Sequence, residues 1–486
     1  MVKKHTNINR LLLVGIFFFS LACNLLARAP LQTVAPQTPT AAASASRLPV
    51  QPSDLPATDT PIVLPTPTGA VSPLAYIPPV CQNKPVATLA PSITLAQPTP
   101  GPKNNPPISQ TEQLKVFEAL ASTITQVYLY PDFNGLDWTA TVKQYRAKIE
   151  SGMDTETFYA EMRNLVAALG DEHSAFQSPA VVAESKAELS GVNNYVGLGL
   201  LGLPMPQKNR ISVLEVFPNS TAEHSGLKQH DSILALDGIP VVKDGKAMPQ
   251  LLRGPPCSAI VLTVQSPGGN PYQITLLRYP VNDPLPMDVR MVPTRDGSNI
   301  GYIFLPSFFD ETFPAKVKQA LADFGNLDGL IIDNRMNNGG SSAVVEPILS
   351  HFVAGNLGNF ISRASTRPFY LAGDPINNSM TVPLVVLVGP DTVSFGEIFS
   401  GILQDQGRAK IVGQSTQGHV ESLHGYDFID GSRAWIAQER FDPAHTHANW
   451  EKKGVTPDVV AYADWDTFTF VNDPSLAAAL KLLGHK

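Results

Sequence analysis

The chain has few charged residues, very few cysteines and no excess of positive charge. Charged residues make up 16% and hydrophobic residues 43% of its 486 residues, which excludes a disordered polyelectrolyte and a bundle of membrane helices. Its 35 basic and 42 acidic residues give a net charge of −7. This balance argues against nucleic acid as a partner, because phosphate binding needs a dense basic face. Three cysteines exclude a disulfide-stapled mini-protein and a Cys-rich zinc module.

Residues 1–28 have the pattern of a secretory signal peptide. A basic start is followed by the apolar run Leu11–Ala22 and then by Cys23. This run is too short to span a bilayer as a helix, which needs about 20 residues. Ser20 to Cys23 resemble a bacterial lipobox, although leucine is usual where Ser20 stands. The resemblance implies that Cys23 is lipidated.

Two alternatives to lipidation stay open for this segment. It could direct plain secretion, or it could remain as an uncleaved anchor extending to Leu26. All three interpretations place the rest of the chain outside the cytoplasm. We expect lipid anchoring to the outer face of a bacterial cell membrane.

Residues 29–107 predict an extended, disordered linker. They hold 19 of the 44 prolines of the chain, with many Thr, Ala and Ser residues. Proline fixes φ and lacks an amide donor, so such a stretch favours a polyproline-like spacer. Cys81 lies in this linker and Cys257 far downstream. With Cys23 lipidated, these two are an even pair in an oxidising compartment, and a disulfide between them is possible.

Three folded units follow, in agreement with the roughly three domains that this length allows at about 150 residues each. Residues 108–185 have apolar positions at three- and four-residue steps and predict a helical bundle that ends at Gly170. Residues 186–282 have short alternating strands with Gly and Pro turns. Residues 283–486 alternate apolar strands with helical stretches, which predicts an α/β core with a mainly parallel sheet.

The middle unit resembles a PDZ domain of the processing-protease type. The motif runs from Ala222 through a Gly-Leu turn and Asp231-Ser232-Ile233 to Asp237-Gly238. The resemblance implies that a glycine-rich loop presents amides to a peptide carboxylate while the sheet edge takes the peptide as an added strand. The alternative is an ordinary small β domain. The implied peptide-binding residues are Tyr195, Val196, Gly197, Leu198 and Gly199.

Two strand ends of the α/β core carry the candidate chemistry. Strand 329–333 runs into a polar turn with Gly339 and Gly340, and strand 384–388 delivers Ser394 to a helix start. In parallel sheets, sites gather at the carboxyl ends of strands. A helix start suits a nucleophile, because its unpaired amides favour developing negative charge, although a lone serine there is more often an N-cap.

These two segments together resemble the C-terminal processing family of serine proteases. The resemblance covers about 375 residues and continues through segments 404–409, 411–413 and 454–458. That family uses a lysine as general base; aligning Ser394 and Thr416 places His419 at that position, and Leu423 stands where the family has glutamine. A serine–lysine dyad is therefore not expected.

The tricorn-type branch of these proteases resembles the chain in having a histidine before the PDZ domain and a glutamate near the end. By position, His173 is then the base and Glu451 its carboxylate partner. His419 is the alternative base or a substrate contact, while His173 could merely cap a helix and Glu451 could be a surface charge. The role of Ser174, which follows His173, stays open.

The oxyanion hole is expected from the amides of Phe395 and of Gly339 or Gly340. Glu397 is expected to brace its helix or to pair with a cation such as Arg335, with direct catalysis as the alternative.

No metal and no organic cofactor is expected for this mechanism. His445, His447 and Glu451 form an alternative zinc cluster, but they lie in an apparent loop. The expected function is an extracytoplasmic serine endopeptidase that cleaves unstructured polypeptide tails through an acyl-enzyme at Ser394. The rivals are a catalytically silent peptide-binding scaffold and a hydrolase of non-peptide esters.

Overall fold

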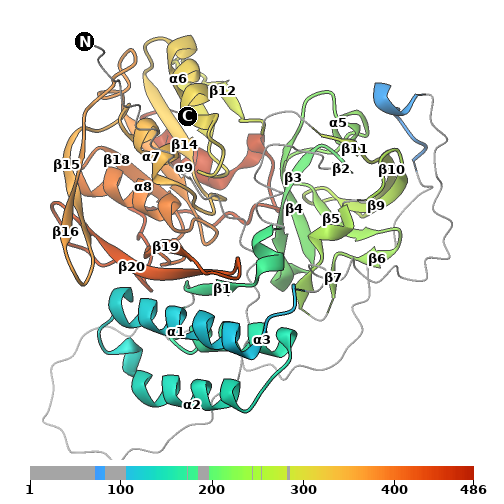
Figure 1. Cartoon of the computed structure of the whole chain (residues 1–486). Coiled ribbons are helices and arrows are strands. Elements are labelled where there is room, and N and C mark those ends of the chain that lie inside the picture. The colour runs from blue at the N-terminus through green and yellow to red at the C-terminus, as the bar shows by residue number, and fades with distance from the viewer. Residues whose placement is uncertain are drawn as a thin grey trace, which may run out of the picture. The chain divides into compact units, whose positions relative to one another are not determined.

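The computed structural model of the chain describes residues 72–82, 105–171, 173–183, 196–243, 245–252, 254–281 and 285–485 (Figure 1). The expected signal segment with Cys23, most of the linker and Tyr195 lie outside the described residues. Within the described ranges, no helix is long and apolar enough to cross a membrane.

Three helices open the folded part of the chain, as the apolar periodicity predicts. They are α1 (Gln110–Val127), α2 (Trp138–Glu150) and α3 (Thr155–Ala167). Ser109 begins α1 with a capping box, in which the Glu112 side chain binds the Ser109 amide. Such caps satisfy amides that have no partner inside the helix.

The helices do not form an independent bundle. Their buried faces pack against strands β1 (Ala175–Gln177) and β20 (Arg433–Pro443), where Ala434, Ile436 and Ala437 complete the hydrophobic core (Figure 1). Strand β1 pairs antiparallel with β20. The expected unit 108–185 therefore shares its core with a strand more than 250 residues away, which places the end of α3 beside the C-terminal part of the chain.

The β-rich region 196–281 is built on an antiparallel sheet with strand order β10-β9-β5-β4-β3, and β6 pairs with β5. A short helix, α5 (Thr221–His224), follows β4. Strand β2 (Val196–Gly197) pairs with β11 (Tyr279–Pro280), which closes the start of the region against its end. The sheet consists of β3 (Leu200–Met205), β4 (Arg210–Val216), β5 (Ser232–Leu236), β6 (Ile239–Pro240), β9 (Ala259–Gln265) and β10 (Tyr272–Leu277).

A disulfide bond joins Cys81 to Cys257, so the pairing that the sequence left open is present. Both sulfurs are buried, together with Leu277 at the end of β10. Ser72 forms a parallel bridge with Ile274 of the same strand. The described piece of the linker, residues 72–82, is thus tied to the β-rich region covalently and through the backbone.

The core sheet has strand order β12-β13-β14-β17-β18-β21, and all its pairs except β12–β13 are parallel. Strands 329–333 and 384–388 form where the sequence predicts them. The strands are β12 (Val289–Val292), β13 (Ile300–Phe304), β14 (Gly329–Asp333), β17 (Leu384–Val388), β18 (Ala409–Gly413) and β21 (Val459–Val460).

Both faces of this sheet are buried, which explains its uninterrupted apolar strands. On β14, Leu330 and Ile332 face a core formed with three helices, and Ile331 faces the opposite core. Helix α9 (Pro474–Leu482) covers that second face. The three helices of the first face are α6 (Phe313–Phe324), α7 (Ser342–Leu349) and α8 (Phe395–Asp405).

The core also contains an antiparallel sheet that the sequence did not predict. Its order is β1-β20-β15-β16. Strand β15 (Gly355–Ile361) pairs with β20 and with β16 (Thr366–Leu371), and β19 (Ser422–Asp427) also pairs with β20. The expectation of a mainly parallel sheet therefore applies to the central sheet and not to residues 283–486 as a whole. Alternating burial along β20 is typical of such a strand, but that periodicity does not reveal its partners.

The β-rich region contacts the core through Trp465. Its indole donates a hydrogen bond to the Val213 carbonyl at 3.0 Å, and its own carbonyl lies 2.8 Å from His230 Nδ1. Asp466, the next residue, accepts hydrogen bonds from Lys208 and Arg210. These contacts link β4 to the segment between β21 and α9.

The Cys81–Cys257 bond is expected to stabilise the β-rich region. Replacing both cysteines by serine should lower the free energy of unfolding by about 2–4 kcal/mol, because the bond restricts the unfolded chain. Denaturant unfolding of the oxidised chain and of the double variant measures this difference. Reductant should shift the wild-type curve and leave that of the variant unchanged; coincident curves for both proteins would contradict the prediction.

Candidate active site

Ser394 lies at the sharp turn between β17 and α8. Its φ of 55° and ψ of −123° are unusual for a residue with a side chain, and such a conformation persists only where the surroundings hold it. The hydrogen bonds of its amide hold this turn: the amide donates to the His419 carbonyl at 2.9 Å and lies 3.1 Å from Glu397 Oε2. The serine is only partly exposed.

The Glu397 carboxylate is fully buried and is the acceptor for the whole neighbourhood of Ser394. It accepts hydrogen bonds from the Gly418 amide at 2.6 Å, the His419 amide at 2.8 Å and the Thr416 hydroxyl, besides the Ser394 amide. Burial raises its pKa, and the hydrogen bonds oppose this shift. The carboxylate thus joins the start of α8 to the segment after β18.

Arg335 does not pair with Glu397. Its guanidinium instead binds Asp333 at the end of β14 and Asp473, with an Arg335 Nη2 to Asp473 Oδ2 distance of 2.6 Å. Asp473 also caps the start of α9. The expected cation partner of Glu397 therefore serves a different purpose, which is to fasten α9 to the central sheet.

The glycine turn after β14 lies directly against Ser394. A Cβ on Gly339 would lie 2.7 Å from the Ser394 Cβ and 3.2 Å from its Oγ, so only glycine allows this approach. The Gly339 amide donates to Asn337 Oδ1 at 3.0 Å and is engaged in this conformation. Of the two glycines considered for the oxyanion hole, Gly340 is therefore the one whose amide is available to donate to an oxyanion.

Gly340 is held by a parallel bridge to Phe308, and a Cβ there would lie 2.1 Å from the Phe308 carbonyl carbon. Among the described residues, the amides of Gly340 and Phe395 donate to no protein acceptor. Phe395 is the first residue of α8, so its amide is one of the donors that a helix leaves unpaired.

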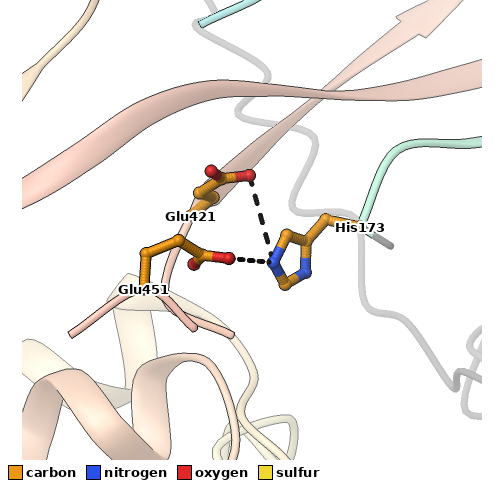
Figure 2. Close-up of side chains that lie close together, drawn as sticks. All are labelled: His173, Glu421 and Glu451. Carbon is orange, nitrogen blue, oxygen red and sulfur yellow. Dashed lines mark hydrogen bonds and ion pairs between the residues drawn. The ribbon is translucent and has the colours of Figure 1, made fainter. Parts of the chain in front are cut away.

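His173 and Glu451 are in contact, as the sequence comparison with tricorn-type proteases implies. His173 Nε2 lies 3.1 Å from Glu451 Oε1, and both residues are buried (Figure 2). The Val420 amide donates to the other oxygen of Glu451, and Asp171 Oδ1 accepts from the His173 amide. The net effect on the His173 pKa is upward: burial lowers it, and the hydrogen bond with Glu451 and the charges of Glu451, Glu421 and Asp171 together raise it by more.

His419 joins Ser394 to this pair. Its ring meets the His173 ring edge to face with centroids 4.6 Å apart, and its carbonyl accepts from the Ser394 amide. The structure therefore gathers Ser394, His419, His173 and Glu451 from segments up to about 280 residues apart into one cluster.

Glu421 belongs to the same cluster and was missed. Its side chain is 1% exposed, and its Oε2 lies 3.9 Å from His173 Nε2 (Figure 2). The Tyr130 hydroxyl donates to its Oε1. Burial, with the charge of Glu451, raises the pKa of Glu421 to about 7. An acidic residue two positions after His419, just before β19, was the available signal, since alternate residues of an extended segment share a face.

Ser174 has a local structural role. Its hydroxyl donates to Asp171 Oδ2 at 2.6 Å and accepts from the Ala437 amide of β20 at 3.0 Å. These bonds fix the turn that carries His173 onto β20.

The alternative zinc cluster does not form in this structure. His447 binds Asp442, and His445 lies beside Gln406, while Glu451 faces His173. The metal-competent group of residues in the described ranges is instead His173, Glu421 and Glu451.

The expected peptide-binding loop lies at the start of the β-rich region. Val196 and Gly197 form β2, Leu198 is buried, and Gly199 has a φ of 75°. A Cβ on Gly199 would lie 2.3 Å from the Ser220 Cβ, so a side chain has no room there.

Comparison with known proteins finds similarity to peptidases. Residues 299–461 match the model of peptidase family S41, and residues 109–167 match the tricorn protease C1 domain. A carboxyl-terminal-processing protease of Synechocystis sp. is 27% identical over 390 residues, which are 77% of this chain and 87% of that protein. Carboxyl-terminal-processing peptidase 2, chloroplastic, of Arabidopsis thaliana is 28% identical over 72% of this chain and 68% of its own length.

A solved structure, the photosystem II D1 C-terminal processing protease, superimposes with a TM-score of 0.55 at 25% identity, over 78% of this chain and 98% of that one. Ser394 and all strands of the central sheet except β12 lie within the S41 match, and the helices before His173 lie within the tricorn match. The chain is a serine-type peptidase that is similar to the carboxyl-terminal processing proteases, and its residues 299–461 match peptidase family S41.

Proposed function

We propose that the chain is an extracytoplasmic endopeptidase that cleaves polypeptide tails through an acyl-enzyme on Ser394. The observation that carries this proposal is the contact of Ser394 with His419, whose ring lies against the His173–Glu451 pair. An imidazole that a carboxylate orients is the kind of base that activates a hydroxyl nucleophile, and His419 links this imidazole to the strained serine at the helix start.

His173 is the proposed general base because a carboxylate fixes its tautomer. With Nε2–H donated to Glu451, the lone pair is on Nδ1, which points away from both carboxylates (Figure 2). As Ser394 Oγ bonds to the substrate carbonyl carbon, its proton passes to the imidazole. The imidazolium then gives that proton to the leaving amine as the C–N bond breaks, and water releases the acyl group by the same steps.

The developing oxyanion is stabilised by two backbone amides. We assign this role to the amides of Phe395 and Gly340, which donate no hydrogen bond to a protein acceptor in the described part of the chain. Preorganised donors of this kind are worth about 3 kcal/mol each in the transition state.

Glu397 acts as a positioning residue. It touches no substrate in this scheme, but it holds the Ser394 amide and the 416–419 segment at the same carboxylate. Loss of its charge would free both the strained turn and His419.

The β-rich region is proposed to be a PDZ domain that captures the tail. Among the described residues, β3 is an edge strand that pairs only with β4, which leaves one side for an added strand, and residues 196–199 come directly before it. The relatives are named for processing carboxyl termini, and a carboxylate-binding loop suits such substrates. The Trp465 and Asp466 contacts provide a route by which capture could change the core.

The disulfide supports a location outside the cytoplasm, because such bonds persist in oxidising compartments. Together with the signal-like start, it supports a lipid-anchored enzyme with Cys23 as the anchor site.

The first test is covalent labelling of the full chain with a fluorophosphonate, read by mass spectrometry. We expect one adduct on Ser394, absent in Ser394→Ala and formed about 10²–10⁴-fold more slowly in His173→Ala. If the adduct still forms in His173→Ala but is lost in His419→Ala, His419 is the base. No adduct, even with added peptide to open the enzyme, would contradict the proposal and favour a silent scaffold.

Glu397→Gln should lower the free energy of unfolding by about 2–3 kcal/mol, because an amide cannot accept from all the donors that the carboxylate holds. Labelling of Ser394 should slow in folded protein as well. Glu346→Gln is the matched control, a half-buried glutamate on α7 of the same core. Equal labelling rates for both variants would show that Glu397 does not position the nucleophile.

A peptide with a free apolar C-terminus should bind the Ser394→Ala chain at least about tenfold more tightly than its C-terminal amide, because charged hydrogen bonds to the loop are lost. Gly199→Ala should abolish the difference, since the added methyl has no room. Gly268→Ala, also at positive φ but in open space, is the control. Equal anisotropy titrations for acid and amide would contradict tail capture.

A further inference from the structure

Three buried side chains with metal-binding atoms converge next to His419, whose carbonyl accepts a hydrogen bond from the amide of the proposed catalytic serine. His173, Glu421 and Glu451, here called the His–Glu–Glu triangle, each offer one ligand atom, and these atoms lie within 4.8 Å of one another. His173 Nε2 lies 3.1 Å from Glu451 Oε1 and 3.9 Å from Glu421 Oε2, as Figure 2 shows.

One corner of the triangle is unsatisfied. Glu421 Oε2 is buried and has no hydrogen-bond partner among the described residues, although it is aimed at His173 Nε2. A buried carboxylate oxygen without a donor is costly. The serine protease mechanism explains the Glu451–His173 contact, but it does not use a second carboxylate at the same nitrogen.

Charge adds to this argument. Two carboxylates face a single imidazole, with Asp171 close behind and the Tyr130 hydroxyl bound to Glu421 Oε1. Among the groups described around the triangle, no lysine or arginine pairs with either glutamate. A divalent cation would neutralise both carboxylates and give Glu421 Oε2 its missing partner.

We propose that the His–Glu–Glu triangle binds a divalent transition-metal ion of the zinc class, which inhibits the peptidase reversibly. Tetrahedral zinc with ligand distances of about 2.0–2.2 Å places ligand atoms about 3.3 Å apart. The separations of 3.1 Å and 3.9 Å need only small side-chain adjustments to reach this value. Three protein ligands and one water complete the coordination that zinc adopts at open sites.

The donor set selects the class of metal. An imidazole nitrogen suits zinc and neighbouring transition metals, whereas calcium takes six to eight oxygens and magnesium a near-octahedral oxygen shell. The Tyr130–Glu421 hydrogen bond and the Val420–Glu451 hydrogen bond orient the two carboxylates from outside, as outer-shell partners do at metal sites.

Inhibition is expected because the metal binds Nε2 of His173, the proposed general base. The inhibition, unlike the binding, rests on the proposed function. With metal on Nε2, the neutral imidazole carries its proton on Nδ1 and has no lone pair for the Ser394 proton. Glu451 is drawn to the metal at the same time. Metal and catalysis therefore compete for the same imidazole.

The binding test uses the full chain with Ser394→Ala, freed of metal with a chelator and titrated calorimetrically with Zn²⁺; Co²⁺ absorption reports the coordination. We expect one tight site, with affinity reduced at least about tenfold in both Glu421→Gln and His173→Ala, as ligand loss requires. Glu439→Gln is the control, since Glu439 contacts His424 at 3.2 Å but is not part of the triangle. Circular dichroism checks that each variant is folded, and should one substitution unfold the chain, the other decides.

A titration without a stoichiometric site, or equal affinity in the Glu421→Gln, His173→Ala and control proteins, would overturn the proposal. In the chain with Ser394 intact, Zn²⁺ should slow fluorophosphonate labelling and a chelator should restore it. Calorimetry does not depend on a reactive serine. Hence a chain that binds zinc but never labels contradicts the proposed function alone, and one that labels but binds no zinc contradicts the metal site alone.

Discussion

The buried carboxylate of Glu397 determines the geometry around Ser394. A serine with positive φ is unfavourable by itself, and residues 416–419 belong to neither a helix nor a strand. One carboxylate accepts from both, so the strain at the nucleophile is offset by bonds that also fix His419. The shared acceptor thus adds to the direct hydrogen bond between the Ser394 amide and the His419 carbonyl, and His419 in turn contacts the His173 ring.

The remaining order follows from the central sheet. Strands β14 and β17 are parallel neighbours, so their carboxyl ends lie side by side and bring Gly339 against Ser394. This part was predictable, because two-sided burial leaves an uninterrupted apolar pattern such as 329–333 or 384–388, and polar residues at the strand ends mark the site. Helices 110–127 and 155–167 were predictable for the same kind of reason, since one face of each is apolar.

What sequence patterns did not reveal depends on contacts between distant segments. The pairing of β1 with β20 sets where His173 lies, yet neither strand carries a local signal of its partner. Glu421 could not be identified from the sequence for the same reason, because only the fold brings His173 and Glu451 next to it. Arg335 was matched to Glu397 by proximity to the site, but the end of β14 and the start of α9 supply two aspartates that bind it more directly. The position of Ser174 is likewise explained by its hydrogen bond from the Ala437 amide of β20 and not by the adjacent His173.

A histidine suits a site with two glutamates better than a lysine would. A lysine must give up its proton to act as a base, and its reference pKa near 10.4 makes that difficult beside carboxylates, which favour the charged form. Histidine starts near 6.5, so it tolerates a carboxylate neighbour and gains orientation from it. Glu421 and Glu451 in this place would hold a lysine protonated, whereas they leave an imidazole usable either as a base or as a metal ligand. A lysine kept protonated by the two carboxylates has no lone pair for a metal ion. The imidazole nitrogen, in contrast, can bind either a proton or a metal ion in the same site.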